Sequence, residues 1–255
     1  MKHLISFVLR YVPRKYLQLV SHWVLKVMAV WYRGEGVECP VCGSHFRKFM
    51  PYGRNPRPNA LCPSCLALER HRLMYLYLQQ RTNFFHDRLK LLHVAPEHCF
   101  IERFEGLKNL DYVTADIESP LAKVKMDLHA IPFAENTFDV AFCNHVMEHV
   151  DNDLRAMGEL RRVLKPNGWA IIQSPIDLAR TTTLEDPAIV TEADREKHYW
   201  QKDHRRLYGL DYKERLEKAG FNVTEDHFVM ELPRQTVEQY ALPDQEIVYF
   251  CRKEV

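Results

Sequence analysis

From residue 89 onward, short apolar runs alternate with amphipathic segments, and this alternation restricts the possible folds more than any other feature. Five runs have the length and composition of buried strands: Leu89–Ala95, Tyr112–Asp116, Val124–Asp127, Phe138–Asn144 and Trp169–Ser174. Two further runs, Phe221–Phe228 and Glu246–Arg252, predict a closing antiparallel pair. Strands that alternate with crossover helices are typical of a parallel sheet. We therefore expect an α/β, Rossmann-like fold with a mostly parallel seven-stranded sheet and helices on both faces.

Two of the expected helices have clear boundaries. One begins near Asn152, turns Leu154, Met157, Leu160 and Leu164 inward, and ends at the Lys-Pro-Asn-Gly turn of residues 165–168. The other runs from Asp211 to Gly220, and Asp211 with Glu214 resembles a capping box at its start.

The cysteines predict a metal site ahead of this sheet. Two C-x2-C pairs, separated by nineteen residues, are formed by Cys39, Cys42, Cys62 and Cys65. Each pair can present two thiolates from one tight turn, so two such turns can enclose a tetrahedral Zn²⁺ ion. A shell of four thiolates leaves no position for water, and we therefore expect a structural role. Seven unevenly spaced cysteines make a poor disulfide framework and suit a reducing cytosol.

Residues 1–33 contain six basic residues and no acidic one, and the part after Pro13 has helical periodicity. The apolar positions fall on one face: Tyr16, Leu17, Val20, Trp23, Val24, Val27, Met28 and Trp31. A basic amphipathic helix can lie on an anionic membrane; alternatively, it covers the catalytic domain or a second copy of the chain. No secretory signal and no bilayer-spanning run are evident, so we expect a cytoplasmic protein, with membrane association as an alternative.

The net charge of +1 hides an asymmetry between the two parts of the chain. Residues 1–90 hold fifteen Lys and Arg against four Asp and Glu, which gives +11 for this part and −10 for the rest. A basic front part favours attraction to phosphate in nucleic acid or at an anionic membrane, although it also complements the acidic remainder.

Two stretches resemble a known enzyme family. They are D-L-H-A-I-P-F-A-E-N-T-F-D-V-A-F-C-N-H-V-M-E-H-V at 127–150 and L-R-R-V-L-K-P-N-G-W at 160–169. Both are similar to the class I S-adenosylmethionine-dependent methyltransferases, in particular the type 11 group, and the resemblance extends from Leu89 to the end. It implies a methyltransferase domain at 83–255 with a substrate lid at 177–210. Ahead of this domain we expect the basic segment at 1–33 and the zinc module with its connecting helix at 34–82.

The resemblance also implies a cofactor site at the carboxyl edge of the sheet. Asp116, followed by Ile117, would accept hydrogen bonds from the ribose hydroxyls, because a carboxylate at this strand end can bind both. Asp127 would accept from the adenine amino group, with the Leu128 N–H facing the ring. Asn144 would end the fourth strand beside the sulfonium.

The first motif departs from the family pattern. The family places an acid and a glycine-rich turn after the first strand, whereas this chain has L-H-V-A-P-E-H at 92–98. Glycines let the backbone approach the cofactor closely, so Ala95 and Pro96 must keep that path by another turn or block it. His93 occupies the usual acid position, and Glu97 is the nearest replacement for a contact with the methionine amino group.

Candidate catalytic residues follow strands four and five. His145 and His149 come after the fourth strand, and K-D-H-R-R-L-Y-G at 202–209 follows the fifth. His204 would act as a base or orient the acceptor, and Arg205 would contact an anion; alternatively, both are solvent-facing charges at a helix terminus.

Three functions are compatible with these features. The first is methyl transfer to a small-molecule, saccharide or lipid-linked acceptor, with the basic helix near a membrane. The second is RNA methylation, in which the zinc module grips phosphates through Arg47, Arg54, Arg57, Arg70 and Arg72. The third is a non-catalytic S-adenosylmethionine-binding or scaffold protein, which the altered first motif makes credible.

Overall fold

The computed structural model describes residues 27, 29–53 and 55–255, and the chain forms two compact units. The second unit comprises Asp87–Pro96, Lys108–Asp226 and Ile247–Val255; the first comprises the residues up to His86 together with Glu97–Leu107 and His227–Glu246. The units are thus interleaved along the chain. The linear division at residues 33 and 82 stays a prediction, and most of the predicted basic helix lies outside the described residues.

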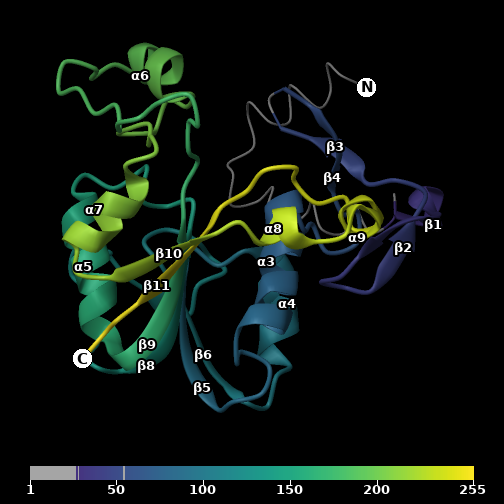
Figure 1. The fold of residues 1–255 in the computed structure, drawn as a ribbon, viewed down its shortest axis with the longest axis horizontal. Coiled ribbons are helices and arrows are strands. Elements are labelled where there is room, and N and C mark those ends of the chain that lie inside the picture. The colour runs from purple at the N-terminus through teal and green to yellow at the C-terminus, as the bar shows by residue number, and fades with distance from the viewer. Residues whose placement is uncertain (1–26, 28, 54) are drawn as a thin grey trace. The chain divides into compact units, whose positions relative to one another are not determined.

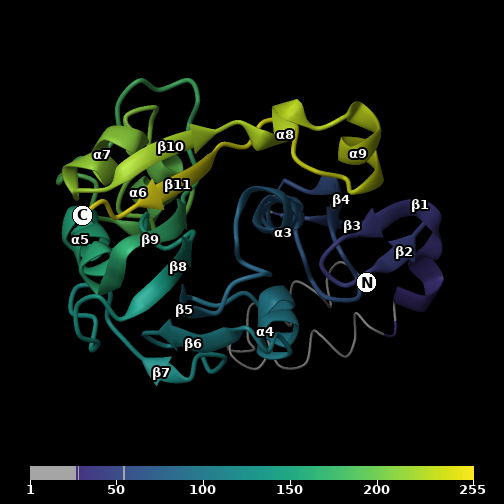
Figure 2. The same ribbon diagram turned by 60° about the horizontal axis from the view of Figure 1, so that its bottom comes forward.

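The second unit is built on one seven-stranded sheet. Its strands are β5 (Leu89–Val94), β6 (Leu110–Asp116), β7 (Val124–Lys125), β8 (Phe138–Asn144), β9 (Leu164–Gln173), β10 (Asn222–Asp226) and β11 (Val248–Arg252). Their order is β10-β11-β9-β8-β5-β6-β7 (Figure 2). Only β11 is antiparallel to its neighbours, and the remaining pairs are parallel. The predicted α/β, Rossmann-like fold is confirmed, and each predicted strand overlaps an observed one.

Helices α5 (Asp153–Val163) and α7 (Tyr212–Lys218) contact each other and pack on the β9–β10 part of the sheet (Figure 1). The Asn152 side chain caps α5, since its Oδ1 accepts from the Arg155 N–H at 3.0 Å. Met157 and Leu160 are fully buried, as predicted, whereas the inward placement of Leu154 was wrong, because this residue is 39% exposed.

The predicted capping role of Asp211 at the start of α7 was also wrong. Its Oδ1 accepts from the backbone N–H and the hydroxyl of Thr183, each at 2.7 Å, and its side chain makes no hydrogen bond to α7. A single sequence does not reveal this competition, because Thr183 lies 28 residues away in the segment that contains α6 (Glu192–Tyr199).

Besides the helical residues 27 and 29–32, the first unit contains two short hairpins and further helices: β1 (Arg33–Cys39) with β2 (Ser44–Phe46), β3 (Met50–Tyr52) with β4 (Arg57–Leu61), α3 (Glu69–Arg81), α4 (His98–Glu105), α8 (Phe228–Glu231) and α9 (Arg234–Gln239). Arg72 lies at its centre and is fully buried. Its guanidinium donates to five backbone carbonyls, those of Asn59, Ala60, Ala67, Tyr240 and Ala241.

These bonds satisfy the Arg72 guanidinium inside the protein, so its predicted role as a phosphate contact was wrong. Arg57 is also engaged, because it forms a two-point ion pair with Glu69 at 2.9 and 3.2 Å. Arg47 donates to the Trp31 carbonyl. Three of the five arginines proposed to grip RNA thus have other partners, and Arg54 lies outside the described residues.

A buried ionic network holds the segment after β9 against α5. The Asp153 carboxylate, 2% exposed, accepts from the Tyr208 hydroxyl at 2.8 Å and from two nitrogens of Arg215 at 2.8 and 2.9 Å. Arg206, 1% exposed, lies 3.8 Å from the same carboxylate and pairs with Glu185 at 2.7 Å. Although burial opposes charge, the hydrogen bonds from Arg215 and the nearby arginines hold the pKa of Asp153 below its usual value.

We predict that Asp153→Ala destabilises the second unit by about 3–5 kcal/mol, because it removes the buried carboxylate that Arg215 and Tyr208 bind and leaves Arg206 and Arg215 with Glu185 alone. Urea unfolding measures this loss as a lower midpoint at similar slope. Asp151→Ala is the matched control, since the exposed Asp151 side chain pairs only at the surface with Arg205 and should contribute less than about 1 kcal/mol. Equal losses in the two variants would contradict this account of the network.

Candidate functional site

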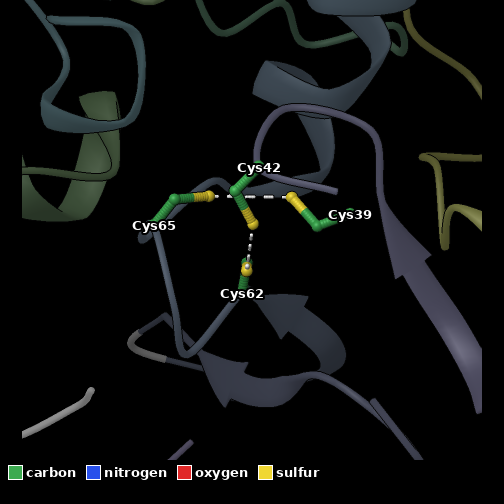
Figure 3. A group of neighbouring side chains, drawn as sticks. All are labelled: Cys39, Cys42, Cys62 and Cys65. Carbon is green, nitrogen blue, oxygen red and sulfur yellow. Dashed lines mark hydrogen bonds between the residues drawn. The ribbon is translucent and has the colours of Figure 1, made fainter. Parts of the chain in front are cut away.

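The four cysteines of the two C-x2-C pairs converge, as Figure 3 shows. The Sγ atoms of Cys39 and Cys65 lie 3.6 Å apart, and those of Cys42 and Cys62 lie 3.8 Å apart. Four thiolates bound at about 2.3 Å in a tetrahedron stand about 3.8 Å from each other, so the observed spacing fits one metal ion.

The two cysteine turns have the same backbone design. In the first, the N–H of Gly43 donates to the Cys39 carbonyl at 2.8 Å; in the second, the N–H of Leu66 donates to the Cys62 carbonyl at 3.0 Å. The residue after each pair is left-handed, with φ of +68° at Gly43 and +66° at Leu66. Leucine avoids this region, so the turn holds Leu66 there at a local energetic cost.

The electrostatics of the cluster also suit a cation. Hydrogen bonds with neighbouring thiols lower the pKa of Cys42, whereas hydrogen bonds of the same kind, together with burial, raise the pKa values of Cys39 and Cys65. Several negative thiolates cannot share so small a buried volume without a compensating charge. Of the described residues, the four cysteines thus form a closed donor set of the kind that holds a structural tetrahedral ion.

A second concentration of polar residues lies in the second unit, where the sheet order changes direction between β5 and β8. The chain leaves each of these two strands through a left-handed residue: Ala95 after β5 has φ of +48°, and His145 after β8 has φ of +55°. The Ala95 N–H donates to the backbone carbonyl of Ala115 at 2.9 Å, and the His145 N–H donates to the backbone carbonyl of Gln173 at 2.8 Å. Ligands of open α/β sheets bind at this switch point, outside the carboxyl ends of the strands.

Ala95 forms the turn that family members make with glycines after the first strand. It adopts the positive φ for which glycine is the usual residue, and Pro96 follows it as a buried residue. The sharp turn after the first strand is therefore present without a glycine.

Acidic residues end the next strands along this edge. Asp116 is half-buried at the end of β6, where its Oδ1 accepts from the N–H groups of Glu118 at 2.7 Å and Ser119 at 2.6 Å. Ile117 beside it is 55% exposed. These bonds shape the loop with one carboxylate oxygen, and among the described residues no hydrogen bond is recorded to the other oxygen, Oδ2.

Asp127 follows β7 and already has a partner. Its Oδ1 accepts from the backbone N–H of His129 at 2.9 Å and lies 2.8 Å from the His129 Nδ1, and these hydrogen bonds lower the pKa of the mostly exposed carboxyl. Leu128 between them is buried. Asp127 can therefore be shared between His129 and a ligand only through its remaining lone pairs.

The other predicted cofactor residues lie in different surroundings. Asn144 ends β8 and is 7% exposed, so it is at the switch point. His93 is fully buried within the sheet, where its Nδ1 lies 2.7 Å from the Tyr112 hydroxyl and its ring packs on Phe142. Glu97 groups with the first unit, and its carboxylate lies 3.8 Å from the His71 Nε2. His93 thus lies inside the sheet of the second unit, and Glu97 belongs to the first unit.

The predicted catalytic histidines gather after β8. The rings of His149 and His204 meet edge to face with centroids 4.8 Å apart, and the Nδ1 of His145 lies 3.5 Å from the Glu148 carboxylate. Burial lowers the pKa of His204, which is 1% exposed. Arg205 points elsewhere, since its Nη2 pairs with Asp151 at 3.1 Å.

Sequence reasoning missed two residues of this region. Glu148 is 2% exposed and accepts from the Ser174 hydroxyl at 3.1 Å; burial opposes its charge, but hydrogen bonding to His145 and the neighbouring imidazoles lower its pKa. Arg206, and not Arg205, is the buried arginine, and it donates to the carbonyls of Met147, Val150 and Asp151. Glu148 could have been noticed from its position between two histidines, whereas nothing in the sequence separates Arg206 from Arg205.

Comparisons with known proteins agree with this architecture. Residues 95–172 match the family model described as a methyltransferase domain. This stretch of the chain is thus similar to a methyltransferase domain. Together with the sheet order, this match supports the predicted assignment to the class I S-adenosylmethionine-dependent methyltransferases.

Two curated relatives share parts of this domain. The Sterol 4-C-methyltransferase strm-1 of Caenorhabditis elegans is 32% identical over 128 residues, which cover 50% of this chain and 32% of that protein. The probable methyltransferase ltbC of Aspergillus luteorubrus is 43% identical over 53 residues, 20% of this chain and 19% of that protein. This chain therefore covers about a third or less of the length of these relatives.

A solved structure extends the likeness of fold beyond the matched domain. The [4+2]-cyclase SpnF is 15% identical with a TM-score of 0.52, and the match covers 92% of this chain and 96% of that one. At this identity the likeness concerns the fold alone, and one fold can support more than one chemistry.

We predict that Ala95→Gly raises the free energy of unfolding by up to about 1 kcal/mol, because glycine adopts a positive φ without the penalty that alanine incurs. Ala95→Val should lower it by more than about 1 kcal/mol, since a β-branched residue avoids this region. Both are measured by urea unfolding. Ala130→Gly, in an exposed bend that lacks a positive φ, should instead be destabilising; a gain there equal to that at Ala95 would rule out the conformational explanation.

Proposed function

We propose that this protein transfers a methyl group from S-adenosylmethionine to a small-molecule, saccharide or lipid-linked acceptor. The observation that carries the proposal is the carboxyl edge of the sheet, where the Ala95 turn, the Asp116 carboxylate and Asn144 end the three strands β5, β6 and β8. This edge has the groups that a nucleoside cofactor needs: a sharp turn for close approach, an acid for ribose hydroxyls, and the exposed Ile117 for the adenine face.

Methyl transfer makes few chemical demands on the protein. It is an in-line displacement at a sulfonium, so alignment of the acceptor and exclusion of water supply most of the catalysis. A base is needed only where the acceptor must lose a proton. His204 suits that role because its lowered pKa keeps the imidazole neutral and able to accept a proton near neutral pH. His145, His149 and Arg205 would orient the acceptor beside it.

Two observations support a small-molecule or lipid-linked acceptor over RNA: the name of one relative, and the internal partners of two arginines. The relative that is 32% identical over half of this chain is named as a sterol methyltransferase, and sterols are small apolar molecules. The RNA alternative loses support from Arg72 and Arg57, whose guanidinium groups are committed within the protein. Transfer of labelled methyl groups into extract fractions would separate the two: label in lipid or saccharide supports this proposal, and label in RNA supports the alternative.

Peripheral membrane contact through residues 1–33 is part of the same proposal. At the end of that segment, Val27, Val30 and Trp31 are 67%, 56% and 69% exposed, as the apolar side of an interfacial helix would be. In the described part of the chain, every helix is too short or too polar to cross a bilayer.

We predict that Asp116→Ala weakens S-adenosylmethionine binding roughly 10- to 100-fold, because a hydrogen bond to a charged acceptor contributes about 1.5–3 kcal/mol. Calorimetry with the intact chain measures the dissociation constant. Asp116→Asn keeps an acceptor for the loop N–H groups and should lose affinity without loss of stability. Asp111→Ala is the control, because this exposed acid lies on the same strand and pairs with Lys90. Unchanged affinity in both Asp116 variants would contradict the proposal that Asp116 binds the ribose hydroxyls.

We also propose that the ion held by Cys39, Cys42, Cys62 and Cys65 is zinc. The sulfur spacing fits its tetrahedral radius, and a closed shell of thiolates gives it a structural role. The hairpins on either side of it are short, and the Arg72 guanidinium contacts carbonyls next to Cys62. The zinc would therefore stabilise the first unit by fixing these two hairpins.

We predict one zinc per chain after exhaustive dialysis against metal-free buffer, and its loss in Cys62→Ser, because three thiolates no longer close the shell. Elemental analysis measures the metal, and thermal unfolding should show a less stable first unit in the variant. Cys251→Ser changes a buried cysteine of the second unit and should keep the zinc. Metal-free parent protein with reduced thiols would contradict the assignment.

A further inference from the structure

A second group of metal-binding side chains lies in the second unit, separate from the four cysteines. Glu148, His149 and His204 each offer one possible ligand atom, and these atoms all lie within 4.8 Å of one another. Glu148 and His204 are 2% and 1% exposed, whereas the His149 side chain is 34% exposed. Two of the three groups are thus buried, and the third leaves an approach from solvent.

His204 gives an independent sign that a ligand is missing from this group. Neither ring nitrogen makes a hydrogen bond of acceptable geometry among the described residues, although the ring is almost completely buried. Buried polar side chains are nearly always hydrogen-bonded, so such an imidazole needs another partner.

We propose that Glu148, His149 and His204 form a second metal site, for a divalent ion of the Zn²⁺ and Fe²⁺ class. Two imidazoles and one carboxylate are a donor set that suits these ions, whereas Mg²⁺ and Ca²⁺ prefer oxygen ligands alone. Ligands at about 2.1 Å from a tetrahedral ion stand about 3.4 Å apart, so the side chains close inward by up to about 1 Å on binding. The partly exposed His149 has the freedom for most of that movement.

The surroundings of the three ligands match those of known metal sites. A ligating histidine usually turns its second nitrogen to a carboxylate or a carbonyl, and the His149 Nδ1 lies 3.5 Å from the Asp203 carboxylate and 3.3 Å from its carbonyl. The Glu148 carboxylate is oriented by the Ser174 hydroxyl and by His145, and it has lone pairs left for an ion. The Asp203, Ser174 and His145 side chains would thus orient the ligands.

Three protein ligands leave at least one coordination position open, in contrast to the closed cysteine site. An oxygen of the acceptor could occupy it and become easier to deprotonate, because a bound cation lowers the pKa of a coordinated hydroxyl. This last step rests on the proposed methyl transfer, and in it the bound ion replaces His204 as the group that promotes loss of the acceptor's proton. The binding of the ion does not rest on methyl transfer, and the two can be tested separately.

The test is the metal content of the full-length chain after equilibrium dialysis against micromolar Zn²⁺. We expect two zinc ions in the parent, and one in His149→Asn, His204→Phe and Glu148→Gln. Phenylalanine keeps an aromatic ring against His149, and glutamine keeps the shape of Glu148. His198→Asn is the matched control, because His198 is an exposed histidine in the same segment, and it should retain two ions. A single ion in the parent, or two ions in all three ligand variants, overturns the proposal.

Cobalt gives a readout that does not depend on zinc counting. In protein whose cysteine site is filled with zinc, added Co²⁺ should produce visible bands of nitrogen and oxygen coordination without thiolate charge-transfer absorption. The bands should appear in the parent and in His198→Asn, and should be absent in His149→Asn. His149→Asn decides the matter if the buried variants fail to fold. Persistence of the bands in a folded His149→Asn overturns the site.

Binding of S-adenosylmethionine to the same samples separates the two proposals. If the parent binds the cofactor but only one ion, the second metal site is wrong and the proposed function stands. If it binds two ions but no cofactor, the site is supported and the proposed methyl transfer fails.

Discussion

The buried carboxylate of Asp153 is the interaction on which the arrangement of the second unit's polar site depends. It pairs with Arg215 on α7 and lies 3.8 Å from Arg206, whose other nitrogens donate to the carbonyls of Met147, Val150 and Asp151. The Arg205 N–H adds a bond to the Glu148 carbonyl at 2.7 Å. The loop after β8 and the segment at 203–208 are therefore fixed to each other by groups that are expensive to separate once buried.

This fixation explains why the histidine cluster exists at all. His149 and His204 are 55 residues apart in the sequence, and no regular element pairs one with the other. Their contact depends on Arg206, two residues after His204, and on the loop carbonyls that Arg206 binds. A hydrophobic contact of similar area would tolerate a shift along the chain, whereas a guanidinium that must satisfy several carbonyls allows one register.

The fold could be predicted from the sequence because its signals are local. Each strand is a run of apolar residues, and the spacing of the two C-x2-C pairs identified the cysteine cluster. The errors concern interactions between distant residues. Arg72 and Arg206 look like surface charges beside Arg70 and Arg205, and only the folded chain reveals the carbonyls that surround them. The left-handed turn at Ala95 could not be predicted either, because alanine, unlike glycine, gives no sign of a positive φ.

The two clusters of metal-binding residues differ in a way that follows from their chemistry. The cysteine sulfurs already stand at the spacing of a bound tetrahedral ion, on turns whose backbone is fixed by Gly43 and Leu66. The ligand atoms of the second cluster lie within 4.8 Å of one another, and one of its side chains, that of His149, is 34% exposed. A site that only holds structure gains from being closed and complete, whereas a site that must admit another molecule has to keep a ligand position open and one ligand movable. As proposed, the cysteine cluster would maintain the first unit, and the histidine cluster would be where chemistry beyond cofactor binding takes place.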